Sequence, residues 1–171
     1  GEVFGTPQYI APERINSIDV TPSADLYALG IIGFQMLAGR LPYVAHDVGS
    51  WFLQHLTSPV PSLASFGVTV HPALDALLRA LMAKSPNERP VDAHRVHADL
   101  VTVAQLLPQR AAGSQAVIPG HVVEPQQKLL RTFIQAAKAF AQGRVILGDR
   151  VAAAGGAIEA EALRVGAVVV H

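Results

Sequence analysis

Cysteine is absent from the 171 residues of the sequence. Its absence excludes disulfide bonds, thiolate zinc sites and cysteine nucleophiles. It also favours a reducing compartment, so we expect a cytoplasmic protein or a cytoplasmic-facing part of a larger one. An excess of charge is lacking too, because 13 basic residues balance 13 acidic ones. Nucleic-acid binders usually carry a basic excess, so we expect no nucleic-acid partner.

Long hydrophobic runs are also missing. The two most apolar stretches, residues 28–37 and 165–170, are much shorter than the roughly 20 residues that a membrane-spanning helix needs, so no membrane span is expected. Hydrophobic residues nevertheless make up 50% of the chain, which is enough for one domain core with an appendage. The chain begins with Gly1 and Glu2 and shows no signal peptide, and this start indicates that an upstream region is missing.

Helices are the secondary structure that the first part of the chain favours. Thr21 and Pro22 are typical of a helix start and Gly39 of a helix end. Apolar residues between them project in every direction, which predicts a helix that is buried on all sides. Apolar spacing predicts three further helices, in the segments 44–56, 72–84 and 90–107.

Composition divides the chain into two modules. Residues 108–125 are rich in Ala, Gly, Gln and Pro, and we interpret them as a linker between a first module (1–107) and a tail (126–171). The tail has an amphipathic helix that ends near Gly143, followed by short predicted strands at 145–147 and 165–170. Two strands are marginally stable alone, so the tail is either docked on the first module or truncated.

Four motifs in the first module carry a resemblance to one family. Residues 5–13, Gly-Thr-Pro-Gln-Tyr-Ile-Ala-Pro-Glu, resemble the end of the activation segment of serine/threonine protein kinases. Residues 25–30 resemble the Asp-x-(Trp or Tyr)-x-x-Gly of the family's central helix, and residues 39–43 resemble the Gly-(Arg or Lys)-x-Pro-(Phe or Tyr) that follows it. Residues 81–90 resemble the segment with the arginine that pairs with the Ala-Pro-Glu glutamate.

The resemblance covers residues 1–107 and implies a fold. The expected fold class is mainly α, an incomplete protein-kinase-like large lobe that lacks its N-terminal part. A linker and a small α/β tail without an assigned role follow it. The family's Gly-Thr-Pro-x-Tyr segment forms the pocket for the substrate residue next to the phosphorylated one. The resemblance therefore implies substrate-binding roles for Gly5, Thr6, Pro7 and Tyr9, with Thr6 near the catalytic aspartate and lysine.

Three charged residues are expected to support this site. By resemblance Glu13 pairs with Arg89, and an arginine suits this place because its planar fork matches a carboxylate at two points. Asp25 lies at the start of the central helix, where the helix dipole favours a carboxylate. The resemblance implies that Asp25 anchors the catalytic loop.

The parts that perform phosphoryl transfer precede Ala-Pro-Glu in the family. They are a glycine-rich loop, a strand lysine, the catalytic loop and the metal-binding triplet. We therefore expect no catalytic residue, no cofactor-binding residue and no metal site in this chain. His94 and His97 share a predicted helix face but have no third ligand.

The parent protein is expected to use ATP and Mg²⁺ to phosphorylate serine or threonine of protein substrates, and this chain alone is expected to be inactive. A non-catalytic, pseudokinase-like interaction or scaffold module is the alternative. The two differ in whether the upstream half carries an intact or a degenerate catalytic apparatus.

Overall fold

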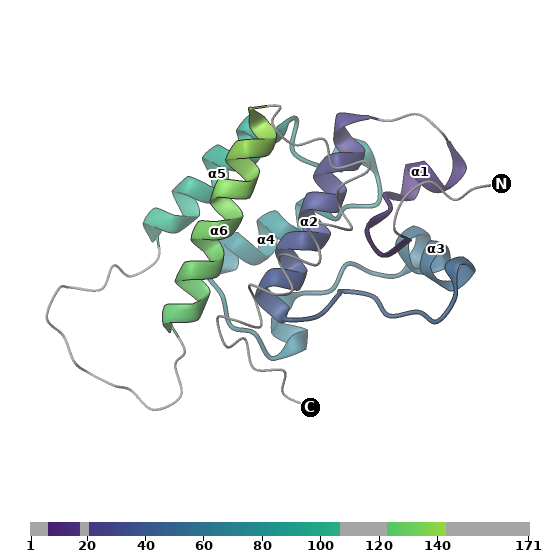
Figure 1. Cartoon of the computed structure of the whole chain (residues 1–171), viewed down its shortest axis with the longest axis horizontal. Coiled ribbons are helices and arrows are strands. Elements are labelled where there is room, and N and C mark those ends of the chain that lie inside the picture. Colours follow the sequence, from purple (N-terminus) through teal and green to yellow (C-terminus); the bar gives the residue numbers. More distant parts are fainter. Residues whose placement is uncertain (1–6, 18–20, 107–122, 143–171) are drawn as a thin grey trace, which may run out of the picture.

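The computed structural model describes residues 7–17, 21–106 and 123–142, and their regular elements are all helical (Figure 1). The short 3-10 helices are η1 (Pro7–Tyr9), η2 (Leu63–Phe66) and η3 (Pro86–Glu88). The α-helices are α1 (Pro12–Asn16), α2 (Pro22–Ala38), α3 (Val48–Thr57), α4 (Pro72–Leu81), α5 (Ala93–Leu106) and α6 (Val123–Ala141). The expected mainly α fold is confirmed. The strands expected at 145–147 and 165–170 lie outside the described residues.

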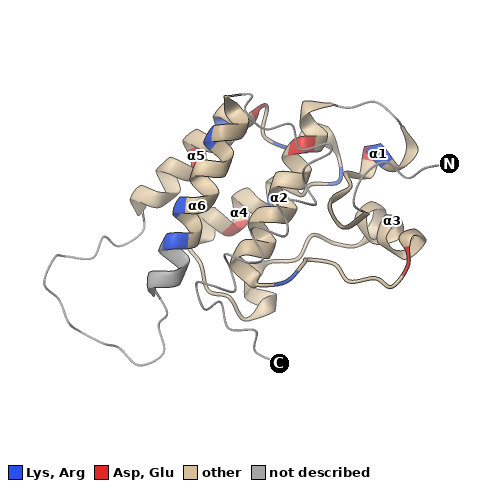
Figure 2. Ribbon diagram, in the orientation of Figure 1, with Lys and Arg blue, Asp and Glu red and all other residues tan. Residues whose placement is uncertain are grey.

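Helix α2 runs through the middle of the molecule, between α1 and α3 on one side and α5 and α6 on the other (Figure 1). It begins where the sequence predicts, with Pro22 in its first turn and the Thr21 Oγ1 accepting the N–H of Ala24 at 3.3 Å. It ends at Gly39, whose φ of 70° lies in the left-handed region that favours glycine. Asp25 is its only charged residue (Figure 2), and the helix is buried on all sides as expected.

The other three predicted helices are present, and each is shorter than predicted. The side chains of Asp47, His71 and Asp92 accept backbone N–H bonds at the starts of α3, α4 and α5, at 2.9, 3.2 and 2.8 Å. These caps set the first turn of each helix, so α3 begins four residues later than the apolar spacing predicts. No helix in the described ranges is both long and apolar enough to cross a membrane.

Helix α6 packs into the same hydrophobic core as α2. Its apolar face is buried, with exposed fractions of 0 to 4% for Leu129, Leu130, Phe133 and Ala137. A Cβ placed on Gly33 of α2 would lie 2.5 Å from Cζ of Phe133, so the missing side chain at Gly33 makes room for this ring. Of the two alternatives left open for the tail, docking therefore holds for this helix, which starts at Val123 within the expected linker.

Candidate functional site

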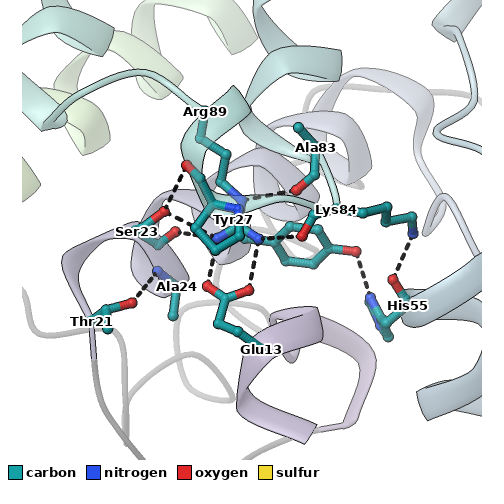
Figure 3. A network of polar contacts seen from close by, with 10 residues as sticks. Glu13, Thr21, Ser23, Ala24, Tyr27, His55, Ala83, Lys84 and Arg89 are labelled. Atoms are coloured by element: carbon teal, nitrogen blue, oxygen red, sulfur yellow. Dashed lines mark hydrogen bonds and ion pairs between the residues drawn. The ribbon is translucent and has the colours of Figure 1, made fainter. Parts of the chain in front are cut away.

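Arg89 and Glu13, 76 residues apart in the sequence, meet in the geometry expected from their motifs (Figure 3). Nη1 of Arg89 donates to Oε1 of Glu13 at 2.6 Å, and Nη2 donates to Oε2 at 2.7 Å. The side chain of Arg89 is fully buried, and that of Glu13 is 22% exposed. Burial raises the pKa of Glu13, but the bonds from Arg89 and from its own backbone N–H outweigh that effect and lower the pKa below its ordinary value.

Arg89 also binds three backbone carbonyls around this pair. Its Nε donates to the carbonyl of Ala83 at 2.9 Å, Nη1 to that of Ser23 at 2.8 Å, and Nη2 to that of Lys84 at 3.2 Å. All five N–H groups of the guanidinium therefore have acceptors, which a buried arginine requires. Since Glu13 belongs to α1, Ser23 to α2 and Ala83 to the loop after α4, one side chain ties three segments together.

The expected substrate-binding residues lie directly before α1. Pro7 and Tyr9 form η1, which packs against both α2 and α3. The hydroxyl of Tyr9 donates to Oε1 of Gln35 on α2 at 2.8 Å, so the turn is fixed to the central helix. Gly5 and Thr6 lie outside the described residues.

Asp25, the third expected supporting residue, is a half-buried carboxylate in the first turn of α2. Burial raises the pKa of Asp25, and the charge of nearby Arg14 lowers it by a smaller amount. The pKa is therefore raised overall.

Sequence reasoning did not find the polar contacts of Lys84, which is half-buried. Lys84 donates from Nζ to the carbonyl of His55 at 2.7 Å, to that of Gln54 at 3.2 Å and to Oη of Tyr43 at 3.0 Å. Burial, together with the smaller effect of the charge of Arg89, lowers the pKa of Lys84 to about 8. The sequence contains one sign that this region is buried. His55 lies four residues after Trp51, so the two side chains share a face of α3.

The described residues include no group of three His, Cys, Asp or Glu side chains that is arranged to hold a metal ion. The contacts described above fix the position of a turn and of the helix after it. The turn Pro7–Tyr9 packs against α2 and α3, and the Glu13 and Arg89 pair fixes α1, the helix that follows it.

Comparison with known proteins points to the same family as the motifs. Residues 1–101 match the family described as "Protein kinase domain". The chain is 32% identical over 126 residues to serine/threonine-protein kinase pkn3 of Myxococcus xanthus, covering 69% of this chain and 23% of that protein. It is 38% identical over 89 residues to Pkn1 of the same organism, covering 52% of this chain and 13% of that protein. It is 37% identical over 89 residues to PknH of Mycobacterium tuberculosis, covering 52% and 14%. The chain thus spans less than a quarter of the length of these relatives.

Proposed function

Because the chain belongs to the protein kinase domain family, we propose that it is part of the large lobe of a serine/threonine protein kinase. The parent protein would transfer the γ-phosphoryl group of ATP to serine or threonine side chains of protein substrates. The observation that carries the proposal is the two-point contact between Arg89 and Glu13, which fixes the segment that resembles the family's substrate-binding turn. The names of the similar kinases support the choice of serine and threonine.

The proposed role of this chain is to hold the protein substrate. Gly5, Thr6, Pro7 and Tyr9 would line the pocket beside the phosphorylated residue. The contact from Tyr9 to α2 supports this role, because it makes the turn rigid at the end nearer α1. Glu13, Asp25 and Arg89 would support the site without touching the reacting atoms.

ATP and Mg²⁺ would be bound by the parent protein through residues other than those described here. Phosphoryl transfer relies on positioning of the reactants and on stabilisation of charge by metal ions, a lysine and a catalytic aspartate. This chain supplies the positioning of the acceptor and none of those charges, so we propose that it transfers no phosphate by itself. The absence of cysteine supports a cytoplasmic location for the part of the parent to which the chain belongs.

A variant at Thr6 tests the proposal in the protein that contains this chain. Phosphorylation of a generic basic protein would be followed with labelled ATP and Mg²⁺, and the labelled amino acid would be identified. We expect phosphoserine or phosphothreonine from the parent, and a loss of most turnover with nearly unchanged ATP affinity in Thr6→Ala.

Thr102→Ala is the matched control, because Thr102 is exposed on α5 and its hydroxyl bonds to the carbonyl of Ala98 in the same helix. It should keep full turnover. A parent protein that binds partners but phosphorylates none of them would contradict the proposal and favour the scaffold alternative. Normal turnover in Thr6→Ala would remove Thr6 from the site.

A further inference from the structure

His55 is a buried histidine that the site described so far leaves without a role. Within the described residues, His55 and Arg89 are the two buried side chains of polar or charged type, and His55 is 0% exposed. Its ring stacks on Trp51 at 6.0 Å between ring centroids, and it meets Tyr27 and Tyr43 edge-on at 5.6 and 5.3 Å. Such enclosure holds the imidazole in one orientation.

The ring is neutral at physiological pH. Burial, with a smaller contribution from the positive charge of Lys84, lowers the pKa of His55 to about 4. A neutral imidazole has one nitrogen that donates a hydrogen bond and one that accepts. The surroundings of the two nitrogens decide which one carries the proton.

Nδ1 faces a hydroxyl, which can donate a hydrogen bond or accept one. Nδ1 lies 2.8 Å from the hydroxyl of Tyr27 (Figure 3). Backbone groups of Pro7 and Gln8 raise the pKa of the ring, as hydrogen-bond acceptors do. The hydroxyl of Tyr27 can donate to Nδ1 or accept from it. A donating Tyr27 puts the proton of the imidazole on Nε2.

The Nε2 edge carries a second signal. Among the described residues, two buried side-chain atoms have no hydrogen-bond partner, and they are Nε2 of His55 and Oε1 of Gln8. With the proton on Nε2, one is a donor and the other an acceptor, and they belong to the two elements that pack together here, α3 and η1. Unpaired buried polar groups are rare and costly, so a donor and an acceptor at one contact indicate a bond that this contact is built to form.

We propose that His55 is a positioning residue that seats the Pro7–Tyr9 turn, by donating from Nε2 to acceptor groups of Pro7 and Gln8. Tyr27 on α2 holds the tautomer, and α3 supplies the ring, so two helices fix the position of the turn through one imidazole. The proposal rests on the proposed function only where it calls this turn substrate-binding. The packing and the proton position stand without it.

The first test needs no variant. Nitrogen-15 NMR of the full chain at pH 7 distinguishes the two neutral tautomers of His55 from their ring shifts. We expect the form with the proton on Nε2. The form with the proton on Nδ1 would overturn the proposal, because Nε2 would then have nothing to donate.

The second test uses two matched amides. In His55→Gln the amide nitrogen reaches the position of Nε2 and keeps a donor toward the turn, whereas in His55→Asn it reaches only the position of Nδ1. We expect hydrogen exchange of the Gln8, Tyr9 and Ile10 amides to be about fivefold faster in the Asn variant than in the Gln variant, the factor that one ordinary hydrogen bond provides. Exchange in α4 and α5 should be alike in both variants.

In the complete kinase the same pair separates positioning from general stability. His55→Asn should have a KM for a peptide substrate about fivefold higher than the unsubstituted kinase, with the KM for ATP unchanged. His55→Gln should keep the peptide KM of the unsubstituted kinase. Equal exchange at residues 8–10 in both variants would overturn the proposal. Exchange and NMR require no phosphoryl transfer, so a parent without kinase activity would leave these two results intact and refute only the proposed function.

Discussion

Replacement of Arg89 by lysine keeps the positive charge and removes the fork. The five N–H groups of Arg89 bind both carboxylate oxygens of Glu13 and the carbonyls of Ala83, Ser23 and Lys84. A lysine has three N–H groups on one nitrogen. In Arg89→Lys at least two of these five oxygens therefore lose their partner in a site where the arginine side chain is fully buried.

The magnitude follows from which bonds are lost. A hydrogen bond between neutral groups contributes about 0.5 to 1.5 kcal/mol, and one to a charged group about 1.5 to 3 kcal/mol. All five bonds of Arg89 are donated by its charged guanidinium, so the loss of two of them lowers the free energy of unfolding by about 3 kcal/mol or more. Arg89→Ala removes the ion-pair partner of Glu13 and should cost about 3 to 5 kcal/mol, the usual result of breaking a buried pair.

Urea unfolding of the full chain at pH 7, followed by circular dichroism, measures these differences. Arg95→Lys is the matched control, because Arg95 pairs with Asp99 one helical turn away and its side chain is 65% exposed. The free energy of unfolding of Arg95→Lys should stay within about 0.5 kcal/mol of that of the unsubstituted chain. An Arg89→Lys variant that unfolds at the same urea concentration as the control would refute the reasoning, since the five bonds would then add nothing beyond a charge.

Three further predictions concern the core, the pH and the turn. Phe133→Ala should lower the free energy of unfolding by about 3 to 5 kcal/mol, and an unchanged urea midpoint would show that α6 is not docked in solution. The pKa of His55 is lowered from 6.5 to about 4, so between these pH values the unfolded chain binds a proton more readily than the folded chain. The free energy of unfolding should therefore fall as the pH drops from 6.5 toward 4, by up to about 3 kcal/mol. His55→Gln should lack that part of the pH dependence, and an identical pH profile would contradict it. Tyr9→Phe loses the bond to Gln35 and should cost about 1 kcal/mol by the same urea assay, with no loss if the bond is absent in solution.

Local signals predicted α2 almost completely. Thr21, Pro22 and Gly39 act on the adjacent backbone, so they mark its ends without knowledge of the rest of the fold. The meeting of Glu13 and Arg89 is different, because 76 residues separate them. Only the resemblance to a known family predicted that contact.

The features that the sequence did not predict depend on several distant segments at once. The amphipathic pattern of α6 shows that the helix has an apolar face, but it does not identify Gly33 as the place where Phe133 packs. Histidine is intermediate in its tendency to be buried, so a single histidine on a short helix does not by itself indicate a buried residue. His55 is buried because Tyr27, Tyr43 and Lys84 converge on it from three other parts of the chain.

The packing of Phe133 on Gly33 joins two residues that are synthesised at different times. Phe133 leaves the ribosome 100 positions after Gly33, which at ordinary elongation rates is about 5 to 20 s later. For that time α2 lacks the ring of Phe133 that packs on Gly33 in the folded chain, and α4 and α5 emerge before α6 can cover this face. A chaperone that binds exposed apolar surface has its clearest opportunity on this chain in that interval.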